Sequence, residues 1–326
     1  MKRRAPLAAV ILTATALLSG CAASGTADEP APKTYKIGVL EVAQAQLIDG
    51  VVKAFRAEVA KGLGPDEKVT FDVHNANGDQ SLITSISRDF AGSDDDAFAV
   101  IGTPAVIALA TQIKDRPVFA LAIGDPVGAG VATSLAKPGG NVTGSIDYVD
   151  PELLLKDLAQ LHPKAATVGT LYDPSNQNMQ VWMKALKASA DKDGVKVIES
   201  TVSSSADVAQ AARSLVGRAD VVLVGPDALV VAGIDAVGAA MSGGRIPLYV
   251  VGGDVTVPGV VGSLGPDYPT LGTKAGDLAV KVLKGASPAS TAFATPGKVQ
   301  IVLNKAAASS LGITVPDSLA SVTTEQ

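Results

Sequence analysis

Short apolar runs rich in Val, Ile, Leu and Ala alternate along this chain with longer segments whose apolar residues recur at helical spacing. One series runs from residue 35 to about residue 145, and a second series begins near residue 166. Alternating strands and helices predict parallel sheets with right-handed crossovers. Two successive series therefore predict an α/β fold with two lobes, each built on a doubly wound parallel sheet.

The first 21 residues have the pattern of a secretory signal. Met1-Lys2-Arg3-Arg4 is followed by an apolar run too short to span a bilayer, and then by Leu18-Ser19-Gly20-Cys21. Cys21 is the sole cysteine, which excludes an intrachain disulfide, and its setting resembles the lipobox of bacterial lipoproteins. We therefore expect residues 1–21 to be a signal peptide ending at a lipidated Cys21. Residues 22–34 are small, polar and proline-containing, and we expect them to form a flexible tether.

The charge balance of the chain limits its partners. The formal net charge is −5, and it becomes more negative when Lys2, Arg3 and Arg4 are removed with the signal. An acidic domain without a basic cluster is not expected to bind nucleic acid or to adhere electrostatically to anionic lipid. We expect a monomer outside the cytoplasmic membrane, held to it by the lipid anchor alone.

Polar residues gather where the predicted strands end. Ligands of open α/β sheets bind beyond the carboxyl ends of the strands, so these residues are candidates for a binding site. The candidates are Gln44, Thr103, Asp125, Ser175, Asn176, Asn178, Asp227 and Asp254. Thr103 fits an N-cap with Pro104 as the first helical residue, and the free amides there suit a carboxylate. Donors for an anion together with carboxylates for a cation suit a zwitterion such as an amino acid. The alternative for each residue alone is a role in a turn or a helix cap.

The stretch 122–141 is rich in glycine and follows an apolar run, as phosphate-binding loops do. A P-loop requires Lys and then Ser or Thr after its last glycine, but Val131 and Ala132 follow Gly130. A dinucleotide fingerprint is expected after the first strand, where Gly38 stands alone. The chain has two histidines, no G-x-S-x-G motif and no cysteine available for a metal cluster. We expect no enzyme activity, no metal and no cofactor.

Five segments carry a resemblance to a known family, in the family's order. They are 117–144 ("PVFALAIGDPVGAGVATSLAKPGGNVTG"), 167–178, 221–231, 259–285 and 301–316. The first closely resembles the signature segment of an ABC transporter substrate-binding lipoprotein family, whose best-known members take up tryptophan and other aromatic amino acids. The resemblance implies a type I periplasmic-binding fold with two lobes joined by three crossovers. Lobe 1 would comprise 35–145 and 258–294, and lobe 2 would comprise 146–257 and 295–326. ABC permease subunits would be its partners.

Carried over by position, the resemblance implies that the ligand is faced by Thr103, Asp125, Ser175, Asn178 and Asp227. Asp227 would bind a ligand ammonium, and Thr103 a ligand carboxylate. Two positions depart from the family pattern: "VAQAQLID" stands where relatives often have His-Pro, and Ala228 where they usually have Asn. Few aromatic residues lie near the strand ends, which weakens the case for aromatic stacking.

The function predicted on these grounds is that of a solute-binding lipoprotein of an ABC importer. Its ligand would be a small polar solute, such as an amino acid or a derivative, held between the lobes. A receptor for a nucleoside or another small solute, or a sensory lipoprotein without a role in transport, is the alternative.

Overall fold

The computed structural model describes residues 33–297, 299–319 and 323–325, and Lys33–Gln326 forms one compact unit. The predicted signal peptide, Cys21 and almost all of the predicted tether lie outside the described residues. Strand β1 begins at Lys33, so residues 33 and 34 belong to the sheet and not to the tether. Among the described helices, none has the length and apolarity needed to cross a membrane.

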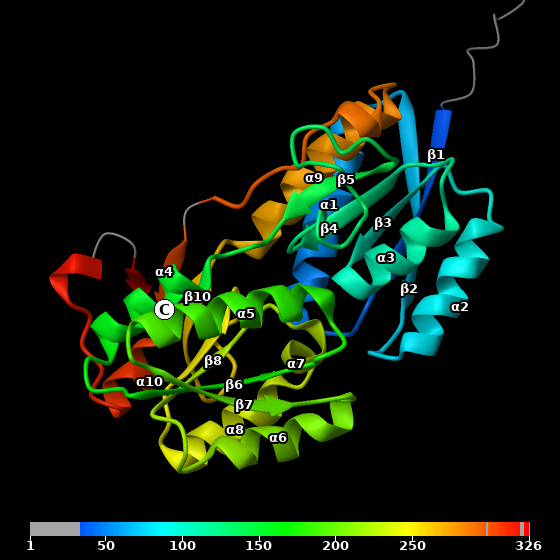
Figure 1. Cartoon of the computed structure of the whole chain (residues 1–326). Coiled ribbons are helices and arrows are strands. Elements are labelled where there is room, and N and C mark those ends of the chain that lie inside the picture. The colour runs from blue at the N-terminus through cyan, green and yellow to red at the C-terminus, as the bar shows by residue number, and fades with distance from the viewer. Residues whose placement is uncertain (1–32, 298, 320–322, 326) are drawn as a thin grey trace, which may run out of the picture. The chain divides into compact units, whose positions relative to one another are not determined.

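The first lobe is built on a parallel five-stranded sheet in the order β2-β1-β3-β4-β5 (Figure 1). Its strands are β1 (Lys33–Glu41), β2 (Glu67–Asn75), β3 (Ala97–Ile101), β4 (Val118–Ile123) and β5 (Val142–Ile146). Its helices are α1 (Gln46–Leu63), α2 (Gln80–Ala91), α3 (Thr103–Gln112) and α9 (Tyr268–Leu283). Helix α1 packs on α9, and α2 packs on α3. Strands β3 and β4 are buried along their whole length, as expected for central strands of a sheet covered by helices.

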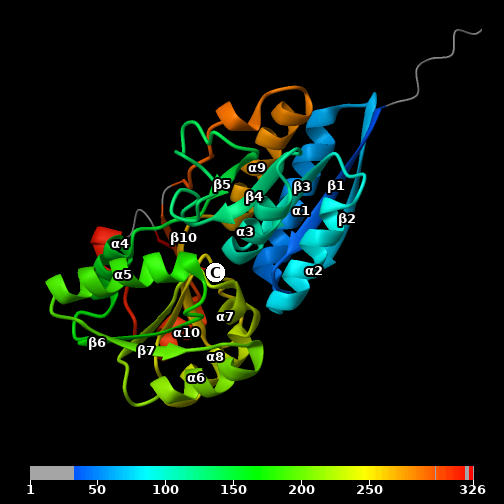
Figure 2. The same cartoon turned by 45° about the vertical axis from the view of Figure 1, so that its right-hand side comes forward.

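The second lobe occupies the lower part of Figure 2. It is built on a seven-stranded sheet in the order β12-β11-β10-β9-β8-β6-β7. Its strands are β6 (Thr167–Tyr172), β7 (Lys196–Thr201), β8 (Val221–Val224), β9 (Leu248–Val251), β10 (Val260–Gly265), β11 (Gln300–Leu303) and β12 (Thr323–Glu325). Its helices are α4 (Pro151–Leu161), α5 (Gln177–Lys192), α6 (Val208–Leu215), α7 (Ala228–Ala232), α8 (Ile234–Gly244) and α10 (Lys305–Ser310). Strand β11 runs antiparallel to β10, and the other pairs are parallel.

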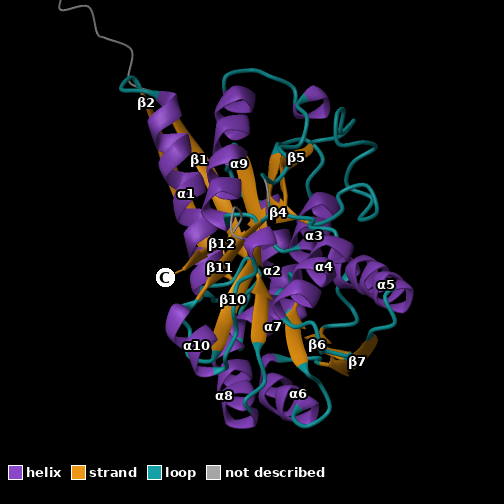
Figure 3. Cartoon of the chain, turned by 90° about the vertical axis from the view of Figure 1, so that its left-hand side faces the viewer, coloured by secondary structure: helices purple, strands orange, loops and turns teal. Residues whose placement is uncertain are grey.

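One predicted lobe boundary is wrong. Residues from 258 were expected to return to lobe 1, but β10 pairs with β9 and β11 and lies inside the second sheet (Figure 3). The chain returns to lobe 1 only at α9, which packs on α1, β4 and β5. After α9 the chain passes beside β5, where Ala294 forms an isolated bridge with Ser145. The lobes are thus joined by residues 147–150, by residues 266–267 and by the segment between Ala294 and Gln300.

Candidate functional site

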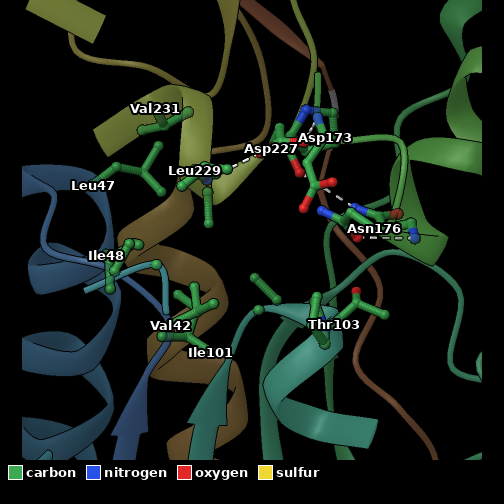
Figure 4. Close-up of a pocket in the computed structure, with 18 of the residues that line it drawn as sticks. Val42, Leu47, Ile48, Ile101, Thr103, Asp173, Asn176, Asp227, Leu229 and Val231 are labelled. Atoms are coloured by element: carbon green, nitrogen blue, oxygen red, sulfur yellow. Dashed lines mark hydrogen bonds between the residues drawn. The ribbon is translucent and has the colours of Figure 1, made fainter. Parts of the chain in front are cut away.

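A cavity lies between the two lobes, at the carboxyl ends of the strands (Figure 4). Lobe 1 contributes residues that follow β1, the β3–α3 turn and Ala122 near the end of β4. Lobe 2 contributes the loops that precede α5 and α7. The cavity therefore occupies the place where ligands of open parallel sheets are found.

The polar end of the cavity is formed in lobe 2 by Asp173, Asn176 and Asp227 (Figure 4). Asp227 is fully buried and caps α7. Its carboxylate accepts from the backbone N–H of Asp173 at 2.9 Å, of Leu229 at 3.0 Å and of Val230 at 3.3 Å. Burial raises the pKa of Asp227 to about 6, and the bonds from the backbone oppose this rise. The carboxylate of Asp227 is thus held in position by the backbone and shielded from solvent.

Near the segments that connect the lobes, the cavity presents a further carboxylate, Asp147, which directly follows β5. Its Oδ2 accepts from the hydroxyl of Tyr268 at 2.8 Å, and both residues are buried. Its Oδ1 is buried and has no hydrogen-bond partner among the residues that the structure describes. Burial raises the pKa of Asp147 to about 6, although the Tyr268 bond lowers it. Such an oxygen is costly to leave unpaired.

Helix α3 begins at the cavity and offers donors. Gly102, and not Thr103, is the N-cap, because the turn requires a φ of 101° that a non-glycine residue rarely adopts. Thr103 is the first helical residue, is buried and lines the cavity. No side chain caps this turn, so the helix N-terminus favours an anionic group.

The remaining wall of the cavity is aliphatic. In Figure 4, Leu47, Ile48 and Val231 lie on the side opposite Asp173 and Asn176. The aliphatic lining comprises Val42, Leu47, Ile48, Ile83, Ile101, Leu229, Val231 and Val251. Among the residues that the structure describes, Tyr268 is the one aromatic side chain in the lining, and no Lys, Arg or His is part of it. The cavity therefore has an acidic, hydrogen-bonding end and an apolar end.

The two lobes touch at the rim of the cavity. Gly124 follows β4 in lobe 1, and a Cβ added to it would stand 1.6 Å from Oδ1 of Asn178 in lobe 2. A Cβ added to Gly78 would likewise stand 2.8 Å from Leu229. These close approaches define a closed arrangement of the lobes, in which glycine is needed at both positions.

Four of the predicted site residues are brought together: Thr103, Asn176, Asn178 and Asp227 line the cavity. Asn176 accepts from the N–H of Asn178 at 3.1 Å, and Asn178 donates to the carbonyl of Pro226 at 3.4 Å. Both amides thus organise the start of α5.

The other four predicted residues do not line this cavity. Gln44 donates to Asp49 at 3.0 Å, and Ser175 to Asp173 at 2.8 Å. Asp125 accepts from the N–H of Gly128, and Asp254 from that of Thr256, both at 2.8 Å. For Asp125, Ser175 and Asp254 the turn role that was the alternative interpretation describes what the side chain does.

Four polar residues of the cavity were not among the candidates: Gln80, Asp147, Asp173 and Tyr268. Asp147 follows a strand just as the candidates do, and recognition of β5 as a strand would have identified it. His74 lies on β2 beside Asp72 at 2.9 Å and does not line the cavity. The described residues contain no cluster of His, Cys, Asp or Glu that could hold a metal ion.

Two α/β lobes, three connecting segments and a cavity between the lobes define a solute-binding protein of the type I periplasmic-binding class. Residues 37–326 match the family described as ABC transporter substrate binding protein. A tyrosine-binding protein from Clostridioides difficile is 33% identical over 274 residues, which are 84% of this chain and 79% of that protein. The chain belongs to the ABC transporter substrate-binding protein family, and it is a solute-binding protein, not an enzyme.

Solved structures give the same result. An ABC domain from Streptococcus pneumoniae in complex with L-Trp is 32% identical, has a TM-score of 0.84 and covers 90% of this chain and 99% of its own. A ligand-free, open substrate-binding protein from Clostridium difficile, with the same identity and coverage, has a TM-score of 0.64. This chain is thus more similar to the L-Trp complex than to the open structure, in agreement with the contacts at the cavity rim.

Proposed function

We propose that this protein binds an amino acid with an apolar side chain in the cavity between its lobes. The observation that carries this assignment is the division of one cavity into an acidic end and an aliphatic end, with no basic side chain in its lining. An amino acid presents an ammonium group, a carboxylate and a side chain within one small molecule. The cavity offers a counterpart to each of the three.

The ammonium group would lie at the acidic end. Asp227 was predicted to bind it, and the buried carboxylate of Asp227 supports that role, with Asp173 beside it. The ligand carboxylate would lie at the start of α3, where the N–H groups of Thr103 and Ala105 have no capping side chain. The side chain would then point toward the aliphatic wall.

A thermal-shift screen tests this assignment. The full chain, in mild detergent and freed of carried-over ligand by unfolding and refolding, is melted with each of the twenty amino acids, nucleosides and sugars. A ligand at 100 times its Kd adds about 2.7 kcal/mol, which corresponds to a rise in Tm of about 5 °C for a chain of this size. We expect L-tryptophan, L-tyrosine, L-phenylalanine or L-leucine to give such a rise, and glycine, lysine and glutamate none.

Analogues show whether both charged groups matter. Tryptamine lacks the carboxylate and indole-3-propionate lacks the amine, so each should bind at least tenfold more weakly than L-tryptophan. A response confined to nucleosides or sugars would contradict the amino-acid assignment and leave the solute-binding class intact.

We propose that the protein acts outside the cytoplasmic membrane as a lipoprotein, with the diacylated Cys21 as its anchor and residues 22–32 as its tether. The lobes would close on the solute by bending at the three connecting segments, and the closed form would deliver it to ABC permease subunits. Differential affinity of the ligand for the closed arrangement suffices for this step.

The anchor can be tested directly, because Cys21 is the sole cysteine. A fatty-acid label should enter the wild-type chain in bacteria and should not enter Cys21→Ser. In a detergent phase separation, the wild-type chain should partition into the detergent phase. Cys21→Ser from which the signal peptide has been removed should partition into the aqueous phase. Equal labelling of both chains would refute the anchor.

A further inference from the structure

Two of the three segments that join the lobes meet at a single hydrogen bond. Asp147 is the first residue of the connection between β5 and α4. Tyr268 is the first residue of α9, directly after the connection from β10. The Tyr268 hydroxyl donates to Asp147 Oδ2 at 2.8 Å, and the two residues are only 4% and 5% exposed. Motion of the lobes about these segments must therefore move this pair or be limited by it.

The same pair faces the ligand cavity. Asp147 and Tyr268 both belong to its lining. Oδ1 of Asp147 is inaccessible and lacks a hydrogen-bond partner within residues 33–297, 299–319 and 323–325. A buried carboxylate oxygen without a donor is rare in native proteins and calls for a partner that the protein alone does not supply. No Lys, Arg or His lines the cavity, so the missing donor is not one of the basic side chains of its wall.

Tyr268 also contacts the second lobe. A Cβ added to Gly252, directly after β9, would stand 1.9 Å from Cε2 and 2.2 Å from Cδ2 of Tyr268, so this side of the ring packs closely on the backbone there. Gly252 has a φ of 69°, which glycine adopts without strain. The ring thus rests on a loop of lobe 2, while its hydroxyl holds a carboxylate at the end of the sheet of lobe 1.

We propose that Asp147 is a ligand-binding residue whose Oδ1 accepts a hydrogen bond from the ammonium group of the solute, and that Tyr268 positions it and links ligand binding to the hinge. This inference rests on the proposed amino-acid function and adds a residue to its site. Asp227 already accepts three backbone N–H donors, whereas Asp147 accepts one side-chain donor and has an oxygen to spare. A cation at Oδ1 would pair with the buried carboxylate, and this pairing would stabilise the closed arrangement of the lobes.

The test compares Asp147→Asn and Asp157→Asn with the wild-type full chain, by calorimetric titration at pH 7.5 with L-tryptophan, or with the strongest ligand of the screen. Asparagine keeps an oxygen for the Tyr268 hydroxyl but replaces the free carboxylate oxygen with an N–H donor. Asp157, on α4, is the matched control, since burial also raises its pKa but it does not line the cavity. We expect Asp147→Asn to lose at least 100-fold in affinity and Asp157→Asn less than threefold. Indole-3-propionate, which lacks the ammonium group, should bind Asp147→Asn as well as it binds the wild type.

Tyr268→Phe keeps the carboxylate and tests the positioning role. The hydrogen bond from Tyr268 lowers the pKa of Asp147. Its removal should therefore raise the pH at which acidification halves the affinity for the ligand. A purely structural role of Tyr268 would change affinity equally at every pH. The titratable side chains that line the same cavity are Asp173 and Asp227, and both are retained in this variant.

The outcomes separate the two proposals. If the wild type binds an amino acid and Asp147→Asn binds it within threefold, the Asp147 assignment is overturned and the amino-acid function stands. If the wild type binds no amino acid and no primary amine, both are overturned. A loss confined to Asp147→Asn and to ligands that carry the ammonium group establishes the assignment.

Discussion

Gly124→Ala should weaken ligand binding by about tenfold to a hundredfold. The added Cβ would stand 1.6 Å from Oδ1 and 2.4 Å from Cγ of Asn178, far inside van der Waals contact. Asn178 belongs to the opposite lobe, so the clash exists only when the lobes are closed. Overpacking of this kind costs about 1–3 kcal/mol, and this cost lowers the population of the closed form.

Asn178 cannot simply turn away. Its side chain is buried and donates to the carbonyl of Pro226, and its backbone N–H donates to the side-chain oxygen of Asn176. The measurement is a calorimetric titration of the wild type and the variant with the strongest amino acid of the screen, together with the radius of gyration by X-ray scattering. The ligand should compact the wild type and should compact Gly124→Ala less at equal saturation.

Gly140→Ala is the matched control for this prediction. Gly140 belongs to the same glycine-rich stretch and to the same lobe, and its added Cβ would find only a carbonyl oxygen of Val131, at 4.0 Å. It should bind ligand as the wild type does. Unchanged affinity in Gly124→Ala would show that the bound form does not bring the lobes together as the structure does.

The glycine-rich stretch shows what a sequence can and cannot specify. The absence of a Lys-Ser or Lys-Thr pair argued against a phosphate loop, and the resemblance correctly indicated the family. The separate uses of the glycines were beyond the sequence: Gly124 accommodates Asn178 across the cleft, and Gly128 lies against the carboxylate of Asp125. The first use depends on a residue of the other lobe that the fold brings near, and the second on the conformation of a local turn.

The candidates that line the cavity follow strands that the sequence made recognisable, and Asp147 follows one that it did not. Thr103, Asn176, Asn178 and Asp227 follow strands with clear apolar runs and line the cavity. Asp147 follows β5, whose sequence "VTGSI" has a glycine and a serine and does not resemble a buried strand. In the fold this strand is fully buried, because it extends the parallel sheet beside β4.

Local polar chemistry explains the candidates that do not reach the cavity. A carboxylate that follows a strand can accept from the N–H groups of its own turn, as Asp125 and Asp254 do. A sequence shows that the side chain is present but not which donor it takes. The pairing of β10 was equally hidden, since an apolar run of six residues does not state which sheet it joins.

Without ligand, the free energy of unfolding of Asp147→Asn minus that of the wild type should be about 3 kcal/mol larger at pH 7.5 than at pH 4. Burial raises the pKa of Asp147 from its ordinary value of 3.8 to about 6, and such a rise corresponds to about 3 kcal/mol. The native chain therefore binds a proton that the unfolded chain has released between pH 4 and pH 6. Stability from this group is complete below pH 4 and is lost as the pH rises through 6.

Asparagine carries no proton to lose, so the variant does not undergo this loss, and its Tm minus that of the wild type should be about 5 °C larger at neutral pH than at pH 4. Melting of both chains from pH 4 to pH 8 without ligand gives the difference. Asp79→Asn provides the opposite sign, because hydrogen bonds from Ser81 and Leu82 lower the pKa of that carboxyl. If the stability difference between the two chains is the same at pH 7.5 as at pH 4, Oδ1 has a hydrogen-bond partner in solution.

Ligand should narrow the stability difference between the two chains at pH 7.5. An ammonium group beside Oδ1 favours the ionised carboxylate and recovers the stability that burial removed, so the same concentration of amino acid should raise the Tm of the wild type by more than that of Asp147→Asn. A residue that destabilises the empty receptor and stabilises the filled one makes closure dependent on the solute. On this argument, the unpaired oxygen in the ligand-free cavity is part of the mechanism by which the protein discriminates the two states.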